Sequence, residues 1–156
     1  MFEYKVSKDM LVECYSDEEE IVIPEGVVST KESVFAQWDN DMMEILRKVE
    51  FSQGFRTLGN SAFTCMGKSC KKLEQVILPE GTESIEDYAF SGCISLRHID
   101  LPKTLVHIGM DAFCGSGLVR IAIPDSVTQL NGNLFKFTEN VFCCGHRAAA
   151  SLGSAA

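Results

Sequence analysis

The chain has no long apolar run, since no stretch approaches the ~18 uninterrupted apolar residues that a membrane-spanning helix needs. Membrane insertion is therefore not expected. Its first residues also lack the basic segment and apolar core of a secretory leader. Basic residues are outnumbered, with 14 Lys and Arg against 22 Asp and Glu, which gives a formal net charge of −8. An acidic chain has no basic face to displace counterions from a nucleic acid, so we expect no nucleic-acid partner.

Cysteine, in contrast, is well represented: there are seven, an odd number, in a chain well above the size of a mini-protein. This usage indicates reduced thiols rather than a disulfide scaffold, and it predicts a cytoplasmic location. A secreted or cell-surface location is the alternative if a leader has been removed. The length of 156 residues, with 46% hydrophobic and 23% charged residues, predicts a single folded domain over residues 1–156.

Proline is scarce, and the positions of its four copies reveal an internal repeat. Pro24, Pro79, Pro102 and Pro124 each follow a short apolar stretch, and Ser52 takes the equivalent place between them. These five anchors are spaced by 28, 27, 23 and 22 residues, within the range of leucine-rich repeats. Half of the ten phenylalanines then stand eleven residues after an anchor, at Phe35, Phe63, Phe90, Phe113 and Phe135.

Each unit predicts a strand, then a turn, then a second short extended piece and a single helical turn. Apolar residues alternate before the anchor, which is typical of a strand with one buried face, and proline ends the strand because it lacks an N–H. A second apolar pulse, such as Leu105 and Ile108, predicts another brief extended piece, and Asp111-Ala112-Phe113 predicts a single helical turn. Such units bury their apolar sides only by stacking. They predict an α/β, right-handed leucine-rich-repeat solenoid with a parallel sheet on one face and short strands and single helical turns on the other.

The unit Ile-Pro-x-x-Val-x-x-Ile-Gly-x-x-Ala-Phe-x-Gly-Cys-x-x-Leu resembles the BspA-type leucine-rich repeat. Residues 101–113 and 89–96 come close to this pattern, and the resemblance covers residues 21–142 as five repeats. The first two units depart from the pattern, with Thr30 and Val34 in the first and insertions at 37–46 and 65–72. The resemblance implies a bacterial surface or secreted module that takes part in adhesion or other interactions.

The two ends of the repeat array are expected to close its core. Residues 3–15 alternate on either side of a polar break at Ser7-Lys8-Asp9, which predicts a hairpin, so residues 1–20 are expected to form an N-terminal cap. Val141-Phe-Cys-Cys144 predicts a last strand, and residues 143–156 are expected to be a C-terminal tail.

One segment offers a nucleotide site as an alternative function. Residues 62–69, Ala-Phe-Thr-Cys-Met-Gly-Lys-Ser, match a relaxed phosphate-loop pattern in which alanine replaces the first glycine. A phosphate loop needs a strand before it and a helix after it. The repeat instead assigns Ala62 and Phe63 to a buried turn and leaves Lys68 in a solvated loop, so the repeat is the favoured interpretation.

Metal binding and nucleophilic catalysis have weaker signals. Structural zinc usually takes two separated Cys-x-x-Cys pairs, a spacing absent from the candidate residues Cys65, Cys70, Cys143, Cys144 and His146. Neither His98 nor His107 stands in a nucleophile motif. We therefore expect no enzyme activity, no cofactor and no metal.

The remaining candidate site is a surface. Residues two and four positions before each anchor point away from the core by alternation and would tile one strip, which we call the open-face ribbon. It consists of Glu20, Val22, Lys48, Glu50, Gln75, Ile77, His98, Asp100, Arg120 and Ala122. Repeat proteins use such faces for partners, so we predict a non-catalytic module that binds a protein or peptide there. A purely structural spacer of a surface assembly is the alternative, and partner identity and oligomeric state stay open.

Overall fold

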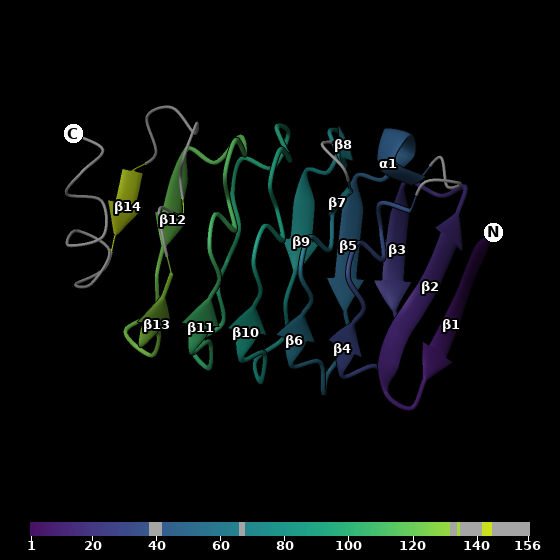
Figure 1. Cartoon of the computed structure of the whole chain (residues 1–156), viewed down its shortest axis with the longest axis horizontal. Helices are drawn as coiled ribbons and strands as arrows, with labels where there is room; N and C mark the ends of the chain where they lie inside the picture. The colour runs from purple at the N-terminus through teal and green to yellow at the C-terminus, as the bar shows by residue number, and fades with distance from the viewer. Residues whose placement is uncertain (38–41, 66–67, 132–133, 135–141, 145–156) are drawn as a thin grey trace.

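The molecule consists almost entirely of short strands joined by tight turns. A computed structural model describes residues 1–37, 42–65, 68–131, 134 and 142–144. Within these ranges the single helix is α1 (Met42–Ile45), which is too short to cross a membrane. The strands lie side by side along the long axis, and the chain begins at one end of this row (Figure 1).

The apolar stretches before the anchors form one set of parallel strands, which we call the open-face sheet. They are β3 (Glu20–Ile23), β5 (Lys48–Phe51), β9 (Gln75–Ile77) and β12 (Arg120–Ala122). β3, β5 and β9 pair in the register expected from the repeat, with Ile21, Val49 and Val76 side by side. β12 pairs with β14 (Phe142–Cys144), which confirms the last strand predicted there.

The second apolar pulse forms the larger sheet. β4 (Ser29–Thr30), β6 (Thr57–Leu58), β10 (Ser84–Ile85), β11 (His107–Ile108) and β13 (Gln129–Leu130) pair in parallel in that order. The predicted hairpin is confirmed as β1 (Phe2–Ser7) and β2 (Met10–Ser16), and it extends this sheet to seven strands because β2 pairs with β4. Leu11 thereby stands beside Thr30 in the row of buried residues that runs through the repeats.

Phenylalanine rings at the predicted position form a stack through the core. Phe35, Phe63, Phe90 and Phe113 are fully buried. Successive ring centroids lie 4.6, 5.3 and 5.3 Å apart, with interplanar angles of 9°, 17° and 2°. Aromatic contacts of this kind add to the stabilisation from burial alone. The prediction is confirmed for these four rings, and Phe135 lies outside the described residues.

The turns that carry these rings differ from the predicted helical turns. Two residues before each ring the backbone is left-handed, with φ of 50–57° at Ser33, Ser61, Tyr88 and Asp111. A left-handed residue interrupts a right-handed helix, so each segment begins with a hydrogen-bonded turn instead of a helical one. In the fourth repeat, for example, the Cys114 N–H donates to the Asp111 carbonyl at 3.0 Å. Neighbouring turns are joined as well, because the Phe90 N–H donates to the Ala112 carbonyl at 2.8 Å.

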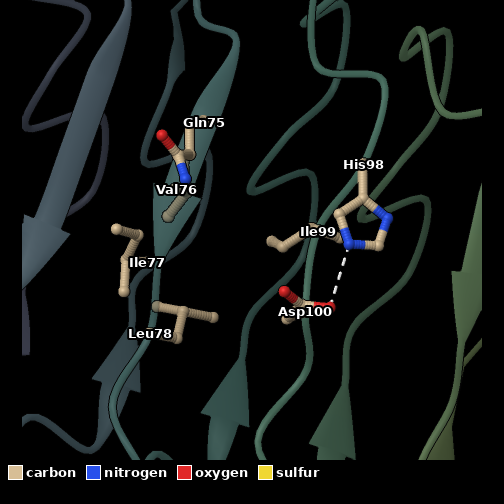
Figure 2. Close-up of a pocket in the computed structure, with 7 residues that line it drawn as sticks. All are labelled: Gln75, Val76, Ile77, Leu78, His98, Ile99 and Asp100. Atoms are coloured by element: carbon tan, nitrogen blue, oxygen red, sulfur yellow. Dashed lines mark hydrogen bonds and ion pairs between the residues drawn. The ribbon is translucent and has the colours of Figure 1, made fainter.

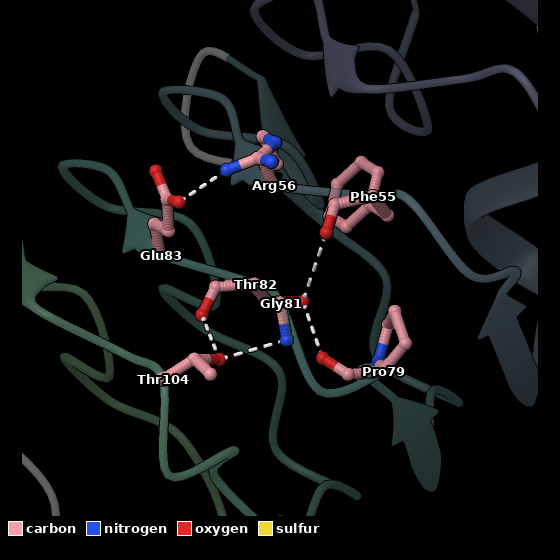
Figure 3. Close-up of polar contacts among 7 residues, drawn as sticks. All are labelled: Phe55, Arg56, Pro79, Gly81, Thr82, Glu83 and Thr104. Carbon is pink, nitrogen blue, oxygen red and sulfur yellow. Dashed lines mark hydrogen bonds and ion pairs between the residues drawn. The ribbon is translucent and has the colours of Figure 1, made fainter.

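A row of buried residues follows the anchors by three positions, and it contains one polar side chain. The row is Val27, Phe55, Thr82, Leu105 and Val127. The hydroxyl of Thr82 is satisfied locally, because it donates to the Pro79 carbonyl at 2.8 Å (Figure 3). In the next repeat the Thr104 hydroxyl donates to the Thr82 carbonyl at 2.9 Å and accepts from the Gly81 N–H at 2.8 Å. Polar contacts thus join adjacent turns at the edge of the core.

Candidate partner-binding face

All ten residues of the open-face ribbon lie on the outer surface. Along every strand the ribbon residues are exposed or half-buried, whereas the residues between them are buried. The pairing register places Glu20, Lys48 and Gln75 in one row. The predicted outward orientation is therefore confirmed, while the binding role of these residues stays a prediction.

The ribbon is interrupted at the fourth repeat. Residues 96–100 form no strand, and no backbone hydrogen bond joins residues 98–100 to β9 in the described part of the chain. In Figure 1 the arrows between β9 and β12 are β10 and β11, which belong to the other sheet, and the open-face sheet has no arrow there. The prediction of a strand before every anchor is therefore wrong for this repeat. Aspartate is disfavoured in strands, and Asp100 bonds to the side chain of His98 two residues back rather than packing across a ladder.

A small pocket of about 80 Å³ opens at this interruption. Figure 2 shows one wall from β9 and the residue after it, and the other from the fourth repeat; the lining is Gln75, Val76, Ile77, Leu78, His98, Ile99 and Asp100. Its volume has room for about two or three water molecules or one short side chain. Four ribbon residues from two repeats therefore meet at one place. Sequence reasoning placed them on one face but missed the pocket, whose only signal is the aspartate within a strand pattern.

Polar groups stand at the mouth of the pocket. His98 Nε2 and Asp100 Oδ1 are 2.9 Å apart, and their side chains are 61% and 95% exposed. A more open hollow lies next to the pocket and shares His98 with it; its other lining residues are Glu74, Ser95 and Arg97. The face therefore combines an apolar floor, formed by the buried Val76 and Ile99, with a charged rim.

Ion pairs tie the charged residues of the first repeats to one another. Lys48 Nζ lies 3.6 Å from Glu20 Oε2 within the ribbon. Beside it, Arg47 contacts Glu19 at 3.3 Å and Glu74 at 2.5 Å. All of these pairs are partly open to solvent, where such contacts contribute little to stability. They are consequently available for exchange with charges of a partner.

The phosphate-loop hypothesis has no support in the geometry. Ala62 and Phe63 are fully buried in the turn of the second repeat. After them β7 (Thr64–Cys65) and β8 (Lys68–Ser69) form an antiparallel pair, and no helix follows β8 in the described residues. A phosphate loop needs a helix N-terminus after it, and the described residues after β8 provide none; residues 66 and 67 of the motif lie outside the described residues.

Three cysteines lie in the core rather than in a reactive site. Burial raises the pKa of the Cys14 thiol to about 12 and raises the pKa values of the Cys70 and Cys93 thiols well above the usual range. Neutral, inaccessible thiols are poor nucleophiles and metal ligands. No group of three or more His, Cys, Asp or Glu among the described residues is arranged to hold a metal ion, and His146 lies outside those residues.

A sequence profile of the BspA type leucine rich repeat region matches six copies across residues 5–142. The chain belongs to the BspA-type leucine-rich repeat family. The profile begins before the first of the five anchored units, and the parallel pairing of β2 with β4 places the second strand of the hairpin in line with the repeats. No curated protein matches this BspA-type chain in sequence.

Solved structures of bacterial leucine-rich repeat proteins are similar to this family member. A Treponema pallidum (T. pallidum) leucine rich repeat protein is 25% identical with a TM-score of 0.75, covering 92% of this chain and 78% of its own. One from Bacteroides ovatus is 24% identical with a TM-score of 0.76, covering 93% and 39%. A leucine rich cell surface protein from Faecalibacterium prausnitzii is 20% identical with a TM-score of 0.50, covering 90% and 52%. The chain thus spans well under two thirds of the latter two proteins.

Proposed function

We propose that this BspA-type repeat chain is a non-catalytic interaction module that binds a protein or peptide along the open-face ribbon. The observation that carries the proposal is the pocket between β9 and residues 98–100, where Gln75, Ile77, His98 and Asp100 come together. Membership of the repeat family supports an interaction role in general. Extended faces of stacked repeats provide large contact surfaces without any one deep cavity.

The chemistry of this face favours an extended segment of mixed charge. The pocket accepts one short apolar side chain against Val76 and Ile99, while Asp100 and Glu50 attract basic groups on either side. Arg120 and Lys48 provide positive charge further along the ribbon. Because neither sign dominates the ribbon, a uniformly charged polymer such as nucleic acid is a poor match.

We also propose a secreted or cell-surface location, the alternative to the cytoplasmic one. One structural neighbour is described as a cell surface protein, which supports it. The odd number of cysteines favours a reducing compartment, but Cys14, Cys70 and Cys93 are fully buried. Buried thiols with raised pKa values react slowly with oxidants, so these three thiols are compatible with an oxidising compartment.

Selection of peptides tests the binding proposal. A random peptide library displayed on phage is panned against the chain, and enriched peptides are titrated against the wild type by fluorescence anisotropy. Ile77→Glu places a charge at the pocket wall and is expected to weaken binding at least about tenfold. Val106→Glu is the matched control, because it adds the same charge at an exposed apolar residue outside the ribbon.

Two results contradict the proposal. Peptides that bind Ile77→Glu as tightly as the wild type show that the partner uses another face. A failure to enrich any peptide favours the purely structural spacer instead, which needs no partner on this face.

A further inference from the structure

The edge of the seven-stranded sheet formed by β1 is a second surface with features of a binding site. β1 is the last strand of this sheet, and no described residue pairs with its outer edge. It is six residues long, whereas the repeat strands of this sheet have two. Tyr4 and Val6 on it are apolar and yet 48% and 36% exposed. A long strand edge of this kind is a template for pairing with another strand.

The sequence of β1 is complementary to itself when it is read in the opposite direction. If Tyr4 faces Tyr4 of a second copy in an antiparallel pair, Glu3 faces Lys5 and Phe2 faces Val6, each of them twice. Opposite charges, and an aromatic residue opposite a β-branched one, are both favourable cross-strand pairs. Residues 2–6 of each strand then have partners of suitable chemistry.

The neighbouring registers are unfavourable. Directly opposed side chains share one face of a sheet, so a symmetric pair of strands shifts in steps of two residues. A shift in one direction places Glu3 opposite Glu3, and a shift in the other places Lys5 opposite Lys5. Like charges directly opposite each other are destabilising. The sequence therefore selects the register centred on Tyr4.

Contacts within the chain order the side chains of β1 and leave them accessible to a second strand. The ring centroids of Phe2 and Tyr4 are 5.3 Å apart and the rings are stacked, so these two side chains lie on the same face of the hairpin. Lys5 Nζ lies 3.3 Å from Glu13 on β2, and both side chains remain exposed enough to accept a further charge. Residues 1–16 hold two lysines and three acids, so the hairpin lacks the acidic excess of residues 17–20.

We propose that two copies of this chain associate through β1, as an antiparallel pair about Tyr4, and join their seven-stranded sheets into one continuous sheet across a two-fold axis. Such a dimer uses no residue of the open-face ribbon, so each copy keeps its ribbon for another partner. Pairing also covers the strand edge that otherwise invites uncontrolled association.

A charge-swap experiment tests the dimer. Sedimentation equilibrium of the full chain, from micromolar to millimolar concentration, gives the dissociation constant of the wild type and of four variants. Glu3→Lys and Lys5→Glu each create two like-charge pairs and are expected to raise that constant about tenfold. The double variant restores opposite charges and is expected to return close to the wild-type value. Lys8→Glu is the control, since it changes the same charge beyond the paired residues and is expected to alter the constant less than about twofold.

The outcomes separate the proposal from its rivals. A dimer that weakens in both single variants and recovers in the double variant, with unchanged melting temperatures, supports pairing through β1. A wild type that is monomeric at every concentration overturns the proposal. A dimer whose dissociation constant is the same in both single variants as in the wild type also overturns it, and so does a dimer that the double variant fails to restore. In either case the interface lies elsewhere on the molecule.

Discussion

Four phenylalanine rings, one from each of four successive repeats, lie nearly parallel through the centre of the molecule. Phe90 has a ring on each side, so its removal leaves a cavity bounded by Phe63 and Phe113. Phe90→Ala is expected to lower the free energy of unfolding by about 3–5 kcal/mol, measured by urea denaturation. Tyr88→Ala, in the same turn but with an exposed ring, is expected to cost less than about 1 kcal/mol. Equal losses in the two variants would show that the stack does not carry the core.

The buried thiols predict how stability depends on pH. Burial raises the pKa of Cys14 to about 12 and raises that of Cys93 well above its usual value. The folded chain therefore holds these protons when the unfolded chain releases them. The contribution of each protonated thiol to the free energy of unfolding is complete below the pKa of about 8.5 that the thiol has in the unfolded chain. Above that pH the free energy of unfolding falls by about 1.4 kcal/mol per pH unit for each thiol. Urea denaturation between neutral and alkaline pH should show this fall, and Cys93→Ala should make it shallower. Identical pH profiles for the two proteins would contradict buried, neutral thiols.

Between elements, the close contact of one turn with the next depends on glycine. Gly109 follows β11, and a Cβ atom there would lie 2.4 Å from the backbone nitrogen of Asp87 in the preceding repeat. Gly109→Ala is therefore expected to separate the two turns and to destabilise the chain by about 1–3 kcal/mol. Thermal unfolding measures the effect. Lys31→Ala is the control at the same place of the first repeat, where the side chain is exposed, and an equal effect of the two changes would be evidence against this packing.

The β7–β8 hairpin gives a further prediction at the scale of elements. Because its strands do not lead into a helix among the described residues, ATP with magnesium is expected to leave the melting temperature unchanged. A ligand that binds the folded chain must stabilise it by mass action. A clear upward shift that Lys68→Ala removes would restore the nucleotide hypothesis.

Elements differ in how far the sequence predicts them. The strands before four of the five anchors and the phenylalanine row follow from the repeat spacing, because a repeat places the same side chain in the same environment each time. The hairpin follows from alternation on either side of a polar break. The left-handed turns were missed because Ser33, Ser61, Tyr88 and Asp111 share no residue type that signals them. There the backbone is fixed by hydrogen bonds to the next repeat, such as that from the Tyr88 N–H to the Met110 carbonyl.

The interruption beside residues 98–100 was missed for a related reason. Alternation predicts which side of a strand faces inward, and it did so correctly for Ile99 and His98. Pairing between strands depends in addition on the neighbouring repeat, about which a local pattern says nothing. The candidate site was therefore predicted as a set of residues, while the pocket that gathers them was visible only in three dimensions.

At the scale of the whole molecule, the core and the proposed partner-binding face use different sides of the same strands. The buried rows hold the repeats together, and the open-face ribbon contributes little to that packing. Ile77→Glu combined with Arg120→Glu is therefore expected to abolish binding of a library-selected peptide while changing the free energy of unfolding by less than about 1 kcal/mol. Anisotropy titration and urea denaturation measure the two effects. Unfolding of the double variant would mean that these side chains serve the core.

The most direct test of the partner-binding face is amide hydrogen exchange with and without a selected peptide. In the free chain no backbone hydrogen bond joins β9 to residues 98–100, within the residues described, so the amides of residues 98–100 are expected to exchange quickly. The bound peptide should slow exchange at residues 75–78 and 97–100 and leave β6, β10 and β11 unchanged. Protection confined to β6, β10 and β11 would place the partner on the seven-stranded sheet and contradict the account.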